Sequence, residues 1–144
     1  MVTRNVMPGA RWFPGATLNY AEHALRRGEG KAEDDPAVVF RREDGLTERL
    51  TFGELRAQVA AARAGLAELG VGRGDRVVAL LPNTPQALVA FLAAASLGAV
   101  WSSCSPDFGV QAVVDRFAQI EPVVLIAVDK YLYGGREFDV RPMV

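Results

Sequence analysis

The sequence has one cysteine and one histidine among its 144 residues. The single cysteine, Cys104, excludes a disulfide within the chain and favours a reducing, cytoplasmic location. The single histidine, His23, excludes a metal site built from several histidines. We therefore predict no metal site in this chain, with His23 near the surface and Cys104 as a small buried apolar residue.

Charge is absent from one long stretch of the chain. No charged residue lies between Arg76 and Asp107, but Pro82, Pro85 and Gly98 interrupt this stretch. The longest apolar run falls short of the ~20 residues that span a bilayer, so it indicates buried core and no membrane partner. A formal net charge of -1 with scattered basic residues lacks the clustered positive face that nucleic acid requires.

The first 36 residues differ in character from the rest. Prolines and glycines surround Trp12 and Phe13, which predicts an irregular arm whose aromatic side chains dock on another surface. A short helix is expected next, over about residues 18–27, with Thr17 or Asn19 near its cap. We therefore divide the chain into an N-terminal arm with a short helix (1–36) and the incomplete first part of a larger domain (37–144).

A β-hairpin and an amphipathic helix are predicted to open this second part. Asp44 and Gly45 lie between two short β-prone runs, and an Asp-Gly pair supplies the positive φ angles of a tight hairpin turn. Thr51 and Glu54 have the spacing of a capping box, so Thr51 is expected to cap a helix. Apolar residues then recur at three- and four-residue steps until Gly70, which predicts one buried helix face.

Beyond residue 75, apolar strands alternate with helices, and Thr84 with Pro85 is expected to begin the first of these helices. Apolar strands connected through helices pair in parallel with right-handed crossovers. We therefore predict an α/β fold, a partial doubly wound parallel sheet of βαβαβ order over about residues 75–129. The expected strands and helices cover residues 76–81, 86–97, 99–103, 110–120 and 123–128.

Ligands of doubly wound sheets bind outside the carboxyl ends of the strands, so three loops are candidate sites: 82–85, 102–109 and 129–136. The second loop places Ser105, Pro106 and Asp107 between the end of a strand and the start of a helix. A structural alternative is that Asp107 caps the following helix while the serines satisfy a turn.

The third loop contains Gly134, Gly135 and Arg136. Its glycines permit close approach of a ligand to the backbone, and its guanidinium could pair with a phosphate. The alternative is a plain surface turn.

Several segments resemble those of adenylate-forming acyl-CoA synthetases. Residues 12–22, Trp-Phe-Pro-Gly-Ala-Thr-Leu-Asn-Tyr-Ala-Glu, resemble the N-terminal signature of acetyl-CoA and acetoacetyl-CoA synthetases. Residues 50–55 and 97–100 resemble the first two core motifs of the superfamily. The form Trp-Ser-Ser-Cys-Ser-Pro-Asp-Phe-Gly at 101–109 is more similar to acetoacetate–CoA ligases than to the acetate enzymes. The resemblance covers about residues 10–138.

The resemblance implies an acid–thiol ligase that uses ATP, Mg²⁺ and CoA. Such enzymes convert acetoacetate into an acyl-adenylate and then transfer the acyl group to CoA. By similarity, the 105–107 loop and the 134–136 turn fall where the related synthetases touch CoA. The family's phosphate loop, adenine-binding motif and C-terminal lysine have no match here. The resemblance therefore implies an N-terminal fragment that holds no catalytic residue and is inactive alone. Its implied partners are acetoacetate, ATP, CoA and the remainder of the enzyme.

Two other functions stay open. One is a freestanding module that binds CoA or a nucleotide. The other is a non-functional truncated remnant, because a three-stranded slice of a doubly wound sheet leaves strand edges and a helix face uncovered.

Overall fold

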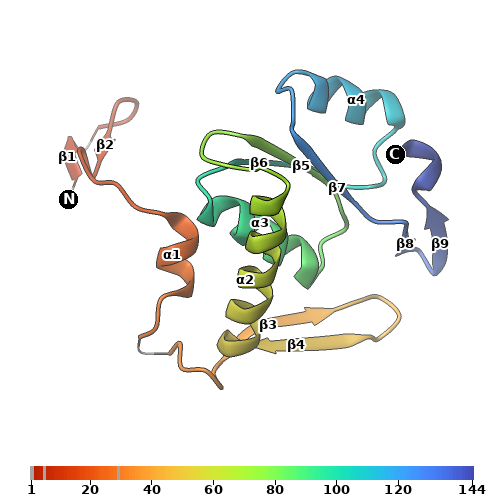
Figure 1. Cartoon of the computed structure of the whole chain (residues 1–144), viewed down its shortest axis with the longest axis horizontal. Helices are drawn as coiled ribbons and strands as arrows, with labels where there is room; N and C mark the ends of the chain where they lie inside the picture. The colour runs from red at the N-terminus through yellow and green to blue at the C-terminus, as the bar shows by residue number, and fades with distance from the viewer. Residues whose placement is uncertain (1, 5, 29) are drawn as a thin grey trace.

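The computed structural model describes residues 2–4, 6–28 and 30–144 (Figure 1). A three-stranded parallel sheet in the order β6-β5-β7 forms its centre, and the described residues also contain three separate antiparallel pairs: β1-β2, β3-β4 and β8-β9. The predicted α/β class and the βαβαβ order of the parallel sheet are confirmed. The elements are β1 (Val2–Arg4), β2 (Arg11–Trp12), α1 (Tyr20–Leu25), β3 (Pro36–Arg41), β4 (Thr47–Thr51), α2 (Phe52–Glu68), β5 (Arg76–Leu80), α3 (Pro85–Ser96), β6 (Val100–Cys104), α4 (Val110–Ala118), β7 (Val124–Ala127), β8 (Lys130–Tyr133), β9 (Arg136–Asp139) and a 3-10 helix, η1 (Arg141–Met143).

Helices cover both faces of the parallel sheet, so the sheet is doubly wound. Figure 1 shows α4 on one side of the strands and α2 with α3 on the other. Successive side chains of a strand point to opposite faces. Accordingly Val77 packs into the core that contains α2 and α3, whereas Val78 and Leu80 pack with Val113 and Phe117 of α4. The central strand β5 thus contributes to two cores.

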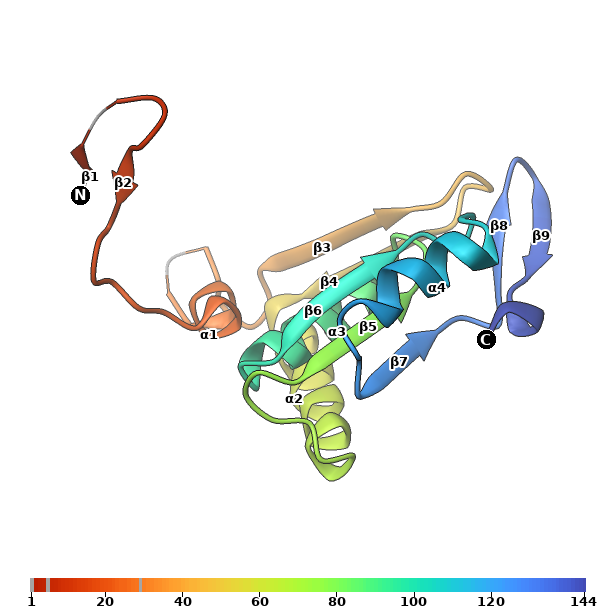
Figure 2. The same ribbon diagram turned by 90° about the horizontal axis from the view of Figure 1, so that it is seen from above.

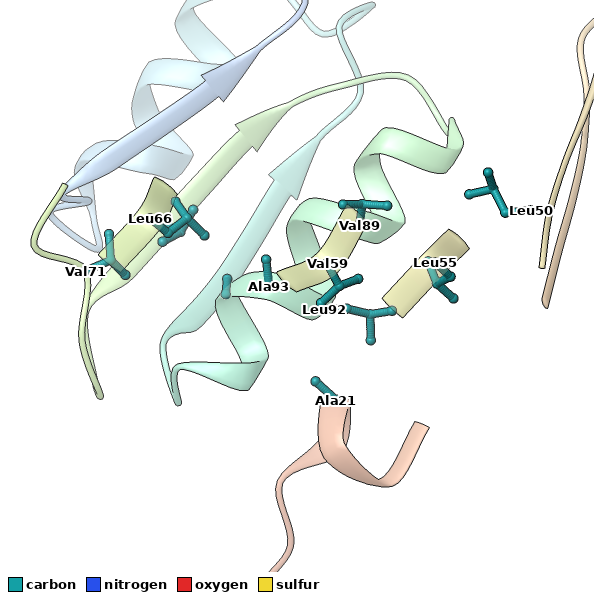
Figure 3. Close-up of a cluster of buried hydrophobic side chains, with 11 residues drawn as sticks. Ala21, Leu50, Leu55, Val59, Leu66, Val71, Val89, Leu92 and Ala93 are labelled. Atoms are coloured by element: carbon teal, nitrogen blue, oxygen red, sulfur yellow. The ribbon is translucent and has the colours of Figure 1, made fainter. Parts of the chain in front are cut away.

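The larger core is built where α1, α2 and α3 meet (Figure 3). Leu55, Val59 and Leu66 of α2 are buried there, as the three- and four-residue spacing predicts. Val89 and Leu92 of α3 lie against them. Burying a leucine or valine side chain contributes roughly 1.5–3 kcal/mol, so this contact between α2 and α3 is a main source of stability.

Two predicted helix caps are present in the structure. The Thr51 hydroxyl accepts the Glu54 N–H at 3.2 Å, and the Glu54 carboxylate accepts the Thr51 N–H at 2.8 Å. At α1, Asn19 is the cap, and its side-chain amide also donates to the Ala95 carbonyl at 2.9 Å. This hydrogen bond links the arm to the end of α3. The helix α1 itself is shorter than the predicted 18–27. Thr84 precedes α3 as expected, but its side chain makes no capping hydrogen bond.

The turn between β3 and β4 differs from the predicted tight Asp-Gly turn. Arg42 donates its N–H to the Leu46 carbonyl at 2.8 Å, and Gly45 donates to the Arg42 carbonyl at 3.0 Å. These bonds enclose a three-residue loop, with the positive φ of +89° at Gly45. Such a loop is a turn followed by a left-handed glycine, and it places Glu43 at the hairpin tip.

Several remaining expectations concern exposure. His23 is exposed and Cys104 is buried, as predicted. Trp12 and Phe13 of the arm are also exposed. Their docking on another surface stays a prediction. Within the described parts of the chain, no helix combines the length and apolar character needed to cross a membrane.

We predict that replacing Thr51 with Ala removes the hydroxyl half of the capping box and lowers the free energy of unfolding by about 1 kcal/mol. Chemical denaturation followed by circular dichroism measures the change. Thr17→Ala in the exposed arm is the matched control and is expected to leave the midpoint in place. Equal midpoints for the two variants would show that the cap adds nothing to stability.

Candidate functional site

The three candidate loops begin at one edge of the parallel sheet. The last residues of the strands are level, since Leu80 pairs in register with Cys104 on one side and with Ala127 on the other. The ladder continues one residue further, because Val128 donates its N–H to the Leu80 carbonyl at 3.2 Å. The predicted carboxyl edge therefore exists as a shared rim, which is where α/β sheets bind ligands.

In the loop after β6, Ser105 and Asp107 are exposed and Pro106 is buried. The Phe108 N–H donates to the Ser105 carbonyl at 3.2 Å, so the backbone closes this turn. Gly109 is the residue that precedes α4, and no side chain caps this helix. The alternative assignment of Asp107 as the helix cap is therefore wrong, because the turn places Asp107 before the helix start. Its carboxylate is exposed at the rim.

Two hollows lie on either side of the loop that follows β5. One of about 380 Å³ is lined by Ser105, Pro82 and Asn83. The other, of about 430 Å³, shares Pro82 and Asn83 and reaches Lys130 and Tyr131 of β8. In the sheet, β6 lies on one side of β5 and β7 lies on the other, so the strand order reverses between β5 and β7. The second hollow is lined by residues that follow these two strands. Crevices at such reversals are common ligand sites in doubly wound sheets.

The segment predicted as the loop 129–136 is instead mostly a β-hairpin. β8 and β9 pair antiparallel, with Tyr133 opposite Arg136. Gly134 and Gly135 form the two-residue turn between them, with φ angles of +60° and +72°. Turns of this kind need positive φ at both positions, which explains the two glycines without any ligand. The surface-turn alternative thus describes the backbone here, and Arg136 is exposed beside the turn.

Glu43 contacts this turn, although it lies about ninety residues earlier in the chain. Its two carboxylate oxygens accept the N–H groups of Gly134 at 3.1 Å and of Gly135 at 2.9 Å. Figure 2 shows the tips of the β3–β4 and β8–β9 hairpins side by side. Sequence analysis missed Glu43, because only its place next to an Asp-Gly pair marks it as a turn residue. Nothing in its local sequence indicates its distant partner.

The residues beside Glu43 form an ion pair of their own. Arg42 and Asp44 are joined at 2.7 Å. The hydrogen bonds from the Arg42 guanidinium and the Leu46 N–H lower the pKa of the Asp44 carboxyl to about 2. Asp44 is therefore held within its own hairpin, and Glu43 is the carboxylate that extends to the neighbouring one.

The predicted contact residues thus occupy two parts of the rim. Ser105 lines the hollow beside β6, whereas Gly134, Gly135 and Arg136 lie at the tip of the hairpin that follows β7. Across the described residues, no three His, Cys, Asp or Glu side chains gather in a way that would hold a metal ion.

Comparison with known proteins identifies relatives over almost the whole chain. The family model described as AMP-binding enzyme matches residues 25–141. Acetoacetyl-coenzyme A synthetase of Rhizobium meliloti is 49% identical over 140 residues, which are 97% of this chain and 21% of that protein. Acetoacetyl-CoA synthetase of Mus musculus is 48% identical over 128 residues, 88% of this chain and 18% of that protein.

A solved structure gives the same result. The acetoacetyl-CoA synthetase from Streptomyces lividans superposes with a TM-score of 0.86 and 56% identity, over 99% of this chain and 22% of that chain. This chain therefore spans about a fifth of the length of these relatives. With a family match over most of its residues, the chain belongs to the AMP-binding enzyme family and is a homologue of the acetoacetyl-CoA synthetases.

Proposed function

We propose that this chain forms the N-terminal part of a cytoplasmic acetoacetyl-CoA synthetase. The whole enzyme would activate acetoacetate with ATP and Mg²⁺ as an acyl-adenylate and pass the acyl group to CoA. Residues 37–144 would then be the first part of its large domain, after the arm and short helix of residues 1–36. The observation that carries this proposal is that 99% of this chain superposes on 22% of the Streptomyces lividans enzyme with a TM-score of 0.86.

Within that enzyme we assign CoA contacts to the 105–107 loop and the 134–136 turn. Two features support the assignment. The 105–107 loop directly follows β6 at the carboxyl edge of the parallel sheet, and the 134–136 turn is the tip of the hairpin that comes after β7 at the same edge. The guanidinium of Arg136 is exposed, and this group suits the phosphates of CoA because it can donate two parallel hydrogen bonds. The amides of Gly134 and Gly135 donate to Glu43, so Arg136 is the group of this turn that a phosphate meets first.

An uncovered surface supports a larger enzyme. A groove of about 570 Å³ runs between α2, α3 and β7, lined mainly by apolar residues that include Leu66, Val89 and Leu125. In the described part of the chain β7 pairs with β5 alone, which leaves its other edge open. We infer that the next part of the enzyme's domain pairs with β7 and fills this groove. In a freestanding module the apolar groove and the open edge of β7 would face water, and both would promote aggregation.

We predict that the chain binds CoA and that Arg136→Ala weakens this binding about tenfold, the loss expected for one charge-assisted pair with a phosphate. Isothermal titration calorimetry with CoA measures the change. Arg63→Ala, which removes an exposed arginine from α2, is the matched control and is expected to bind like the unmodified chain. Equal affinities of the two variants for CoA would show that Arg136 does not contact CoA.

The purified chain alone is expected to show no acetoacetate-dependent exchange of pyrophosphate into ATP. By family resemblance, the groups that hold the triphosphate and promote adenylation belong to later parts of the enzyme. Radiolabelled exchange, run beside a full-length acetoacetyl-CoA synthetase, makes the test. Clear exchange by the chain would show that it holds the adenylation machinery.

A further inference from the structure

The Gly134–Gly135 turn has the geometry of a small anion site. Both residues have left-handed φ angles, of +60° and +72°, and their N–H groups point to one acceptor. Successive backbone N–H groups that converge in this way form a concavity that binds anions. The observed acceptor is itself an anion, since the two N–H groups meet the two separate oxygens of the Glu43 carboxylate. A negatively charged group therefore already occupies this concavity.

The surroundings allow this occupant to be exchanged. Glu43, Gly134 and Gly135 are all exposed, so water and solutes reach the contact. Water competes for both partners of an exposed hydrogen bond, so this contact is easier to exchange than a buried one. Arg136 follows the turn directly and adds a positive charge beside the two amides. An anion of higher charge than a carboxylate would gain more from this combination.

We propose that the Gly134–Gly135 turn is an oxyanion site closed by the chain's own Glu43, and that a phosphate group of the ligand displaces this carboxylate. Two amides and a guanidinium then hold the phosphate, and the β3–β4 hairpin is released from the β8–β9 hairpin. Glu43 acts as an internal competitor for the site. The identification of the ligand as CoA rests on the proposed function above, whereas the preference for a phosphate rests on the turn itself.

The test uses inorganic pyrophosphate and CoA as separate probes of the 144-residue chain. Nuclear magnetic resonance follows the N–H signals of Gly134 and Gly135 during each titration. Glu43→Gln removes the competing charge, and we expect pyrophosphate to bind about tenfold more tightly, as when one charge-assisted hydrogen bond no longer has to be broken. Glu48→Gln is the matched control, because it removes the same charge from β4 of the same hairpin.

The outcomes separate this inference from the proposed function. Tighter pyrophosphate binding in Glu43→Gln alone, with shifts at both glycine signals, supports the internal competitor even if CoA does not bind. Equal affinities in all three proteins, or titrations that leave both glycine signals unmoved, overturn it even if CoA binds elsewhere. A shift of the two signals in Glu43→Gln before any ligand is added is expected too. Unchanged signals would mean that Glu43 does not occupy the turn in solution.

Discussion

The burial of β5 between two helical layers is the constraint on which the rest of the structure depends. Val77 faces α2 and α3, while Val78 and Leu80 face α4, and all three side chains are almost fully excluded from solvent. The strand is also hydrogen-bonded along both edges, to β6 and to β7. A shift in register would move its apolar side chains to the wrong faces. The level ends of the three strands follow from this fixed register, and so does the rim from which the candidate loops emerge.

That rim brings segments that are far apart in the sequence to one side of the molecule. The loops after β5 and β6 share a hollow, and the hairpin after β7 leaves the same edge. The Glu43 contact adds the β3–β4 hairpin, which precedes the sheet in sequence, to this side of the molecule. An anion that displaces Glu43 would therefore alter the contact between the β3–β4 and β8–β9 hairpins.

Much of the fold is predictable because its signals are local. The capping box at Thr51 and Glu54 lies within four residues, and the α2 core face follows from helical periodicity alone. The βαβαβ order follows from apolar runs separated by helical ones.

The β8–β9 hairpin was missed because Gly134 and Gly135 suggested a ligand loop, although a Gly-Gly pair between β-prone residues is also a turn signal. The assignment of Asp107 as a helix cap was wrong because a backbone turn from Ser105 to Phe108 comes before the helix. This turn leaves Gly109 as the residue that precedes the helix. Glu43 lay outside local reasoning, since its partners are about ninety residues away.

We propose that these 144 residues form the first part of an acetoacetyl-CoA synthetase, and that the 105–107 loop and the 134–136 turn contact CoA. The most direct measurement replaces the matching segment of the Streptomyces lividans enzyme with this chain and assays acetoacetyl-CoA formation from acetoacetate, ATP and CoA. We predict a chimera that makes acetoacetyl-CoA at a rate comparable to its parent. A chimera that folds like the parent, binds ATP and forms no acetoacetyl-CoA would contradict the claim.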